Sequence, residues 1–241
     1  MTGVQTCALP ISPDCVDAPS GIAGWWRGEG DGVDAAGGHD GTLENGLGFA
    51  DGIVGQAFDF NASAQHLLIP ASAELTVQSF TIEAWINPTT VATHQPLVEY
   101  SPISGYAGVH LWLSIDPTGS WVLPGSLYAN VISEGGESHL IGTATGVIEP
   151  GVWSHVALSY DQDTGHARLF HDGNEVVSQN LGVFTPSTDL PVFVGHRPIG
   201  NTGDPMGQTF SGRMDEVSIY RRALSAAEIA AIHAAGSAGK C

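Results

Sequence analysis

The chain has 241 residues and is strongly acidic, with 25 Asp and Glu against 7 Lys and Arg and a formal charge of −18. A surface of this sign repels phosphate, so nucleic acid and anionic membrane surfaces are excluded as partners. Hydrophobic residues make up 42% of the chain, enough for a core, while 32 Gly and 14 Pro indicate many turns. No run reaches the ~18 apolar residues of a membrane-spanning helix. The composition favours one turn-rich β domain.

The first eleven residues, MTGVQTCALPI, resemble a translated sequencing adapter. We therefore treat residues 1–11 as non-native and expect a single domain over residues 12–241. The alternative is a poor signal peptide, but the segment has no basic residue, and Thr6, Cys7 and Pro10 interrupt its apolar stretch. On our interpretation, any secretion signal or upstream domain is missing from this sequence.

Two cysteines, Cys15 and Cys241, belong to the expected domain and lie at its opposite ends. Chain termini often lie close together in compact domains, and disulfides persist in oxidising compartments. We therefore predict a Cys15–Cys241 disulfide and a secreted or cell-surface location. The alternative is two unrelated free thiols.

Alternating apolar and polar residues predict β-strands along most of the chain. Phe80, Ile82, Ala84 and Ile86, for example, form one face of a strand that Pro88 ends. A tight turn at residues 172–173, Asp-Gly, predicts a hairpin. The predicted strands are residues 22–27, 56–60, 66–69, 80–87, 97–100, 109–115, 127–132, 155–160, 168–171, 175–178, 192–195 and 213–220. Their number and spacing indicate two packed sheets.

One helix is predicted over residues 226–235. Ser225 can cap its N-terminus, Glu228 can complete a capping box, and Gly236 can end the helix. An Ala-rich helix of three turns is marginal alone, so it must pack on the sandwich. The side chains expected to hold it there are those of Leu224, Ile229 and Ile232.

Several segments in order resemble one family. They are GWW at residues 24–26, GGHDGTL at 37–43, VGQAFDF at 54–60, FTIEAWI at 80–86, WSHVA at 153–157, FSGRMDEVSIY at 210–220 and RALSAAEI at 222–229. Together they resemble LamG-like jelly-roll domains of the concanavalin A-like lectin/glucanase superfamily. The resemblance implies an all-β, two-sheet antiparallel jelly-roll sandwich with one short C-terminal helix. It also implies a concave face that relatives use for glycans, for proteins or for nothing known.

No catalytic residues are predicted. Glucanases of this superfamily carry Glu-x-Asp-x-Glu or Glu-x-Asp-x-x-Glu along one strand, because alternate positions share a face and flank the glycosidic bond. Neither pattern occurs here, and Glu83 and Glu99 are isolated acids. The sequence also lacks a nucleophile elbow, a zinc motif and a phosphate loop.

An acidic, glycine-rich segment at residues 29–40 supplies the oxygen ligands that calcium prefers. The resemblance implies a structural Ca²⁺ between this segment and an acid on the last strand. The matching ligands are Glu29, Asp34 and Asp215, with Asn61 as a weaker candidate. The alternative is a solvated acidic loop in which Asp215 accepts hydrogen bonds from turn amides.

Aromatic and polar side chains on the strands could form a carbohydrate site, since sugars have apolar faces and hydroxyl edges. The candidate ligand-binding residues are Glu83, Trp85, His110, Trp112 and Asn130. The alternative is that each Trp belongs to the core.

These observations predict an extracellular, non-catalytic LamG-like module that binds a glycan or a surface protein, as part of a larger secreted protein. A second hypothesis is a structural or self-associating domain of an extracellular layer, fibre or adhesin. A third is a glycoside hydrolase or lyase without the usual motif, which needs two carboxyl groups roughly 5 to 9 Å apart.

Overall fold

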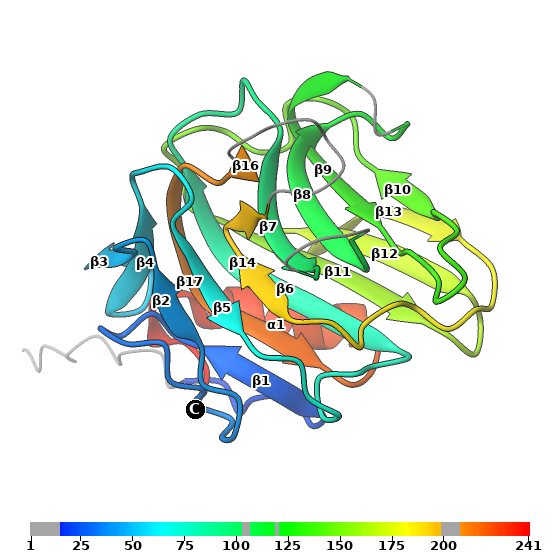
Figure 1. The fold of residues 1–241 in the computed structure, drawn as a ribbon, viewed down its shortest axis with the longest axis horizontal. Coiled ribbons are helices and arrows are strands. Elements are labelled where there is room, and N and C mark those ends of the chain that lie inside the picture. Colours follow the sequence, from blue (N-terminus) through cyan, green and yellow to red (C-terminus); the bar gives the residue numbers. More distant parts are fainter. Residues whose placement is uncertain (1–14, 103–106, 119–120, 199–207) are drawn as a thin grey trace, which may run out of the picture.

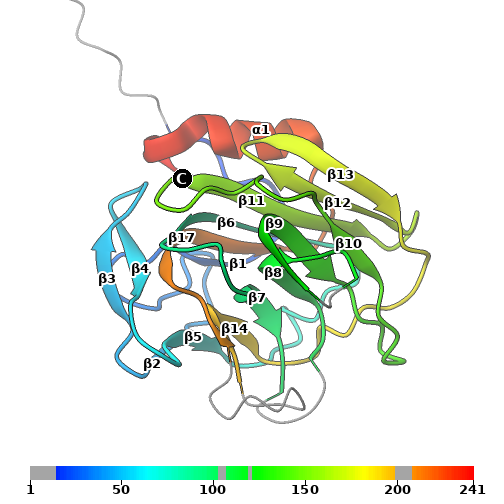
Figure 2. The same ribbon diagram turned by 90° about the horizontal axis from the view of Figure 1, so that it is seen from above.

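The computed structural model describes residues 15–102, 107–118, 121–198 and 208–241. The adapter-like residues 1–11 lie outside them. Two large antiparallel sheets pack face to face, and one helix lies on the outer face of the first sheet (Figures 1 and 2). The predicted all-β jelly-roll sandwich with a short C-terminal helix is confirmed.

Sheet 1 has the strand order β13-β12-β11-β6-β17-β4-β3, and β1 also pairs with β17. Its strands are β1 (Ile22–Trp26), β3 (Gly48–Asp51), β4 (Gln56–Phe60), β6 (Phe80–Pro88), β11 (Ser154–Asp161), β12 (His166–His171), β13 (Asn174–Asn180) and β17 (Gly212–Tyr220).

Sheet 2 has the order β10-β9-β8-β7-β14-β5-β2, and β15 pairs with β16 in a separate small ribbon. The strands of sheet 2 and the ribbon are β2 (Thr42–Glu44), β5 (His66–Ile69), β7 (Gln95–Tyr100), β8 (His110–Ile115), β9 (Val122–Asn130), β10 (Leu140–Gly142), β14 (Val192–Val194), β15 (His196–Arg197) and β16 (Gln208–Thr209).

The core lies between the two sheets and follows the predicted alternation. Phe80, Ile82, Ala84 and Ile86 of β6 are all buried in it. Each of the twelve predicted segments forms a strand, whereas five further short strands were not predicted. Those five, β2, β3, β10, β15 and β16, have two to four residues each. A period-two pattern is weak over so few residues, and of comparably short strands only β5 and β14 were predicted.

The predicted hairpin and helix are both confirmed. Asp172 and Gly173 have φ of 47° and 75°, as a type I′ turn requires, and they join β12 to β13. Helix α1 (Ala226–Ala235) carries the capping box between Ser225 and Glu228, and the short 3-10 helix η1 (Gly236–Ala238) follows it. The helix packs on the outer face of sheet 1 through buried apolar side chains (Figure 2): Leu224, Ile229 and Ile232 against Ala157, Phe170 and Tyr220.

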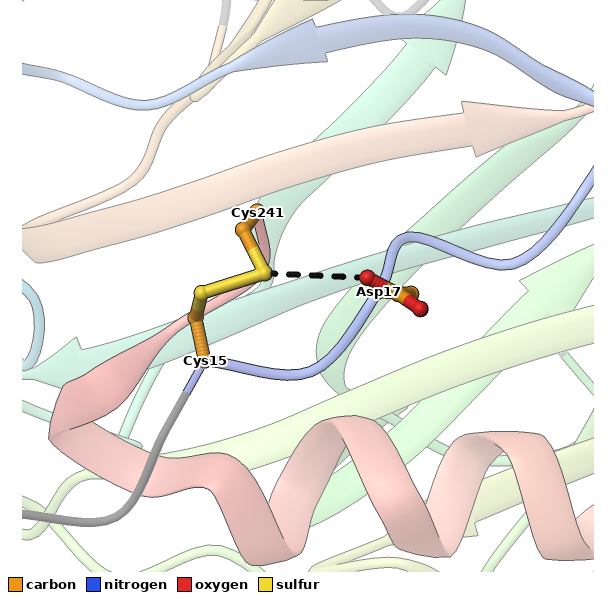
Figure 3. Close-up of a disulfide and its surroundings, with 3 residues drawn as sticks. All are labelled: Cys15, Asp17 and Cys241. Carbon is orange, nitrogen blue, oxygen red and sulfur yellow. Dashed lines mark hydrogen bonds between the residues drawn. A yellow bond between two sulfur atoms is a disulfide. The ribbon is translucent and has the colours of Figure 1, made fainter.

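The two ends of the described chain meet beneath the helix. Cys15 and Cys241 form the predicted disulfide, with 5.5 Å between their Cα atoms (Figure 3). Val16 and Lys240 form a parallel β-bridge beside it. Among the described residues, the helices are too short or too polar to cross a lipid bilayer.

Candidate functional site

The five predicted ligand-binding residues divide between the two sheets and do not form one site. Glu83 and Trp85 lie on β6 in sheet 1, on the outer face that α1 covers. His110 and Trp112 lie on β8, and Asn130 lies on β9, on the outer face of sheet 2. Alternation separates the two faces of one strand, but it does not say which sheet a strand joins.

Glu83 belongs to a buried ionic cluster, the Lys240 cluster. The Lys240 ammonium lies 2.9 Å from Glu83 Oε1 and 3.2 Å from Glu216 Oε2. His155 Nε2 lies 3.0 Å from Glu83 Oε2, and the Trp25 indole donates a 3.1 Å hydrogen bond to Glu216. All five residues of this cluster are buried.

The Lys240 cluster is arranged for stability, with no access for a substrate. Burial penalises the Glu83 carboxylate, but Lys240 and His155 outweigh it and lower its pKa to about 2. Burial raises the pKa of Glu216. Glu83 on β6 and Glu216 on the neighbouring strand β17 both contact Lys240, so two carboxylates do lie close together. The sequence could not reveal this. They share one ammonium under the helix and cannot flank a glycosidic bond.

Trp85 packs between the sheet and the helix. Its ring stacks on His233 of α1 at 5.4 Å between centroids and meets His155 edge-on at 5.3 Å. The side chain is buried. Trp85 thus lies enclosed between sheet 1 and α1.

The other three candidates do come together, in what we call the Trp112 cluster: Glu99, His110, Trp112, Tyr128, Asn130 and Arg197. The Trp112 indole donates to Glu99 Oε2 at 3.0 Å, and Arg197 Nε donates to Glu99 Oε1 at 2.6 Å. The guanidinium of Arg197 lies 4.3 Å from the centre of the Trp112 ring. Sequence reasoning missed Arg197, because its two-residue strand carries no periodic signal.

The Trp112 cluster is closed. Trp112 is 2% exposed and Asn130 is 7% exposed. Burial, assisted by Arg197, lowers the pKa of His110 to about 3, so this ring is neutral at physiological pH. Burial also raises the pKa of Glu99 against the opposing effect of Arg197. These side chains form a rigid floor and present little surface to a ligand.

An open hollow of about 350 Å³ adjoins this floor, at the end of sheet 2 where β9 begins. We call it the His94 hollow. Gln208 of β16 lies opposite Arg197 of β15, which connects the hollow to the Trp112 cluster. His94 Nε2, Gln208 Oε1 and Arg197 Nη2 are buried and have no hydrogen-bond partner among the described residues. The hollow is lined by Thr93, His94, Val122, Gln208 and Thr209.

Two of the four predicted calcium ligands, Asp34 and Asn61, lie apart from the other two and make hydrogen bonds of their own. Asp34 Oδ1 accepts hydrogen bonds from the amides of Trp25 and Ala36, and Asp34 Oδ2 accepts one from the amide of His39. Its carboxylate is committed to holding its own loop. Asn61 lies at the end of β4, where its amide donates to Asp59 at 2.8 Å. In the described part of the chain, no three His, Cys, Asp or Glu side chains gather as a metal site would require.

The other two predicted ligands contact the same turn, between β3 and β4. Asp215 Oδ2 accepts from the amides of Ile53 and Val54 at 2.9 Å, and Glu29 accepts from the amide of Gln56 at 3.3 Å. The amide contacts of Asp215 match the alternative to calcium.

Asp215 also has an unused oxygen. Its Oδ1 is buried without a partner among the described residues, and burial raises its pKa to about 7. A Cβ on Gly52 would lie 2.5 Å from Asp215 Oδ2 and 2.7 Å from the Gln56 carbonyl oxygen. Glycine at position 52 therefore lets this turn approach Asp215 more closely than any residue with a Cβ could.

Known structures share this architecture. Domain 4 of AbnA, an extracellular arabinanase from Geobacillus stearothermophilus solved with arabinotriose, has a TM-score of 0.64 and 22% identity, over 87% of this chain and 96% of that one. The botulinum neurotoxin serotype D ligand-binding domain, solved with N-acetylneuraminic acid, has a TM-score of 0.65 and 11% identity, over 89% of this chain. The binding domain of Paraclostridial Mosquitocidal Protein 1 has a TM-score of 0.62 and 16% identity, over 87% of this chain.

The chain spans about half the length of the two toxin domains, 50% and 52%. At these identities the likeness concerns the fold alone. No curated protein matches the chain in sequence. The sequence profile of the Laminin_G_3 family, described as the concanavalin A-like lectin/glucanases superfamily, matches residues 61–230. The chain therefore belongs to this laminin G-like family of the concanavalin A-like superfamily.

Proposed function

We propose that this domain is an extracellular, non-catalytic carbohydrate-binding module whose ligand occupies the His94 hollow. The observation that carries the proposal is the pair of unpartnered polar atoms on side chains that line the hollow, His94 Nε2 and Gln208 Oε1. A buried polar atom without a partner costs about 1–3 kcal/mol. Sugar hydroxyls both donate and accept hydrogen bonds, so a glycan in the hollow would offer the missing partners to His94 and Gln208 once these two side chains turn towards it.

The surroundings of the hollow support a sugar rather than an ionic ligand. Val122, which is 44% exposed, offers an apolar contact for a sugar ring, and Thr93 and Thr209 offer hydroxyls. The chain charge of −18 disfavours anionic ligands. Two structural neighbours were solved with saccharides, one with the neutral arabinotriose and one with the anionic N-acetylneuraminic acid. We favour a neutral glycan.

A binding role is favoured over hydrolysis by the state of the described carboxylates. Glu99 is held by Arg197 and Trp112, and the pair Glu83 and Glu216 is sealed around Lys240. Hydrolysis needs an accessible acid and an accessible base or nucleophile on either side of the bond. Incubation with the bound glycan should therefore release no reducing sugar.

A glycan array followed by calorimetric titration tests the proposal. His94→Ala and Gln208→Ala should each weaken binding of the best array ligand about tenfold, the equivalent of roughly 1.4 kcal/mol. Gln179→Ala, at an exposed position of β13 on the other sheet, is the matched control and should bind as the wild type does. Absence of binding to every neutral glycan would contradict the proposal.

A structural role in an extracellular layer is the second candidate function. The closed Trp112 cluster supports it, because a packing unit needs no open concave face. Sedimentation over a range of protein concentrations separates the candidates. Concentration-dependent assembly without glycan binding supports the structural role, whereas a monomer that binds glycan supports the module.

We also propose that the module holds a structural calcium ion at the turn between β3 and β4. Asp215, Glu29 and backbone carbonyl oxygens would be its ligands, and the unpartnered Asp215 Oδ1 is the supporting observation. Calcium should raise the unfolding temperature of the wild type and a chelator should lower it. Asp215→Asn should remove this response, while Glu134→Gln, at an exposed site elsewhere, should retain it. An unfolding temperature that calcium and chelator leave unchanged would contradict this proposal.

A further inference from the structure

A second hollow surface lies at the ends of β4, β6 and β17. It consists of adjoining hollows of about 510 Å³ and about 270 Å³, which share Phe60, Asn61 and Ser211. We call it the Arg213 groove. Of the candidate site residues above, Asn61 and Thr209 line it. Its polar lining comprises Asp59, Asn61, Asn87, Thr89, Ser211 and Arg213.

The Arg213 groove continues into the His94 hollow. Thr209 lines both the smaller hollow of the groove and the His94 hollow. Every residue from 208 to 213 lines at least one of the three hollows, so one extended segment forms their shared wall. Five residue steps at about 3.3 Å each give this wall a length of roughly 16 Å. That length exceeds a single sugar ring.

We propose that the ligand is an extended, neutral oligosaccharide chain that lies along residues 208–213, from the His94 hollow into the Arg213 groove. This inference rests on the proposed function and adds to it the class of ligand. The domain would recognise several consecutive sugar units of a polysaccharide, because one unit fills only one hollow.

The polar groups of the groove are held in place before any ligand arrives. Asn61 donates to Asp59 Oδ2 at 2.8 Å, and Arg213 Nη1 donates to the Asp51 carbonyl at 3.0 Å. Thr89 and Ser211 lie within hydrogen-bond distance of each other through their hydroxyls, 2.5 Å apart. Groups fixed in this way lose little conformational freedom on binding, which favours recognition of sugar hydroxyls.

One side chain in the groove is left free to meet a ligand. The Asn87 amide makes no hydrogen bond with any described residue, although its neighbours Thr89 and Ser211 are paired. A side-chain amide both donates and accepts, and so suits a pair of adjacent sugar hydroxyls. Asn87 is therefore the residue whose removal should affect binding without affecting the fold.

A glycine fixes the shape of the groove where β17 starts. Gly212 has φ of 140°, and a Cβ at this position would lie 2.2 Å from the Asn87 carbonyl oxygen. Only glycine lets the start of β17 approach the end of β6 this closely. The approach brings Asn87 and Arg213 to the same groove.

The charge of the groove selects a neutral chain. Asp59 and Arg213 contribute one charge of each sign, with 3.9 Å between Arg213 Nε and Asp59 Oδ1. The remaining polar lining residues are uncharged, and the whole chain carries −18. Anionic polysaccharides would be repelled at long range, whereas neutral chains would meet balanced donors and acceptors.

Calorimetric titration with linear arabino-, xylo- and cello-oligosaccharides, from disaccharide to hexasaccharide, tests the inference. The protein should come from a host without N-glycosylation, because the sequon Asn61-Ala62-Ser63 lies in the groove. Wild-type affinity for the preferred series should rise at least tenfold with chain length. Asn87→Ala and Arg213→Ala should reduce hexasaccharide affinity to the disaccharide value and leave disaccharide affinity unchanged. His94→Ala should weaken both.

The outcomes separate this inference from the proposed function. Affinity independent of chain length, or hexasaccharide binding unchanged in both groove variants, would overturn the extended site while the module still binds sugar. Failure of all these oligosaccharides and of every neutral array glycan would overturn both. Arg213→Lys is the control variant that keeps the charge at this position. Unfolding temperatures of all the variants establish that the fold is intact.

Discussion

Lys240 is the only lysine in the chain, and its ammonium contacts two buried carboxylates. Burying three charged groups is costly unless they are paired. Lys240 pairs with both Glu83 and Glu216, although Glu216 Oε1 is left without a partner among the described residues. Sequence reasoning treated Glu83 as a possible sugar ligand because its strand partners could not be seen. The partner that decides its role lies at the end of the chain, 157 residues away.

Lys240→Met should destabilise the protein by about 3–5 kcal/mol, because both carboxylates would stay buried without their cation. Equilibrium denaturation measures the loss. Adding Glu83→Gln and Glu216→Gln to the variant should recover most of the stability. A midpoint unchanged by Lys240→Met would show that the cluster does not stabilise the fold.

The same cluster predicts a pH dependence. The folded-state pKa of Glu83 is lowered to about 2 from 4.5, so its stabilising contribution is complete above pH 4.5 and is lost as the pH falls towards 2. The stability difference between wild type and Glu83→Gln, measured by denaturation at several pH values, should shrink across this window. A difference that stays constant or grows towards low pH would be the contrary result.

At the scale of elements, helix α1 covers the outer face of sheet 1 over β11, β12 and β17 (Figure 2). Its position was predictable because its caps are local: Ser225 accepts from the Glu228 amide, and Glu228 accepts from the Ser225 amide. Strand pairing is not local, so the sequence could not show that β6 and β8 belong to different sheets. Arg197 escaped detection for the same reason.

Ser225→Ala should lower stability by about 1 kcal/mol, because the first turn of α1 would lose a capping acceptor. Ser178→Ala, at an exposed position of β13, is the control and should change little. Thermal and chemical unfolding both report the difference. Equal stability of the two variants would mean that the capping box contributes nothing.

For the whole molecule, the disulfide joins residues 226 positions apart and fixes the segment that carries Lys240 (Figure 3). The sequence predicted this pairing from two cysteines at the ends of the domain. It also predicted twelve of the strands and the family. It could not predict the hollows, because their walls come from β4, β6, β9, β16 and β17, which only the fold brings together.

Replacing both Cys15 and Cys241 by Ser should reduce stability by at most about 5 kcal/mol, through the entropy regained by the unfolded chain. Because Lys240 directly precedes Cys241, the stability lost on removing the disulfide should be coupled to the stability lost in Lys240→Met. A double-mutant cycle should give a loss smaller than the sum of the two separate losses. Strict additivity would indicate that the disulfide does not hold Lys240 in place.

The most direct test of the central claim, that a neutral glycan binds in the His94 hollow, is a residue-specific NMR titration of the side chains of His94 and Gln208. Addition of the best-binding neutral oligosaccharide should shift both sets of signals along one saturation curve. Shifts confined to other surfaces, or none at saturating oligosaccharide, would contradict the account.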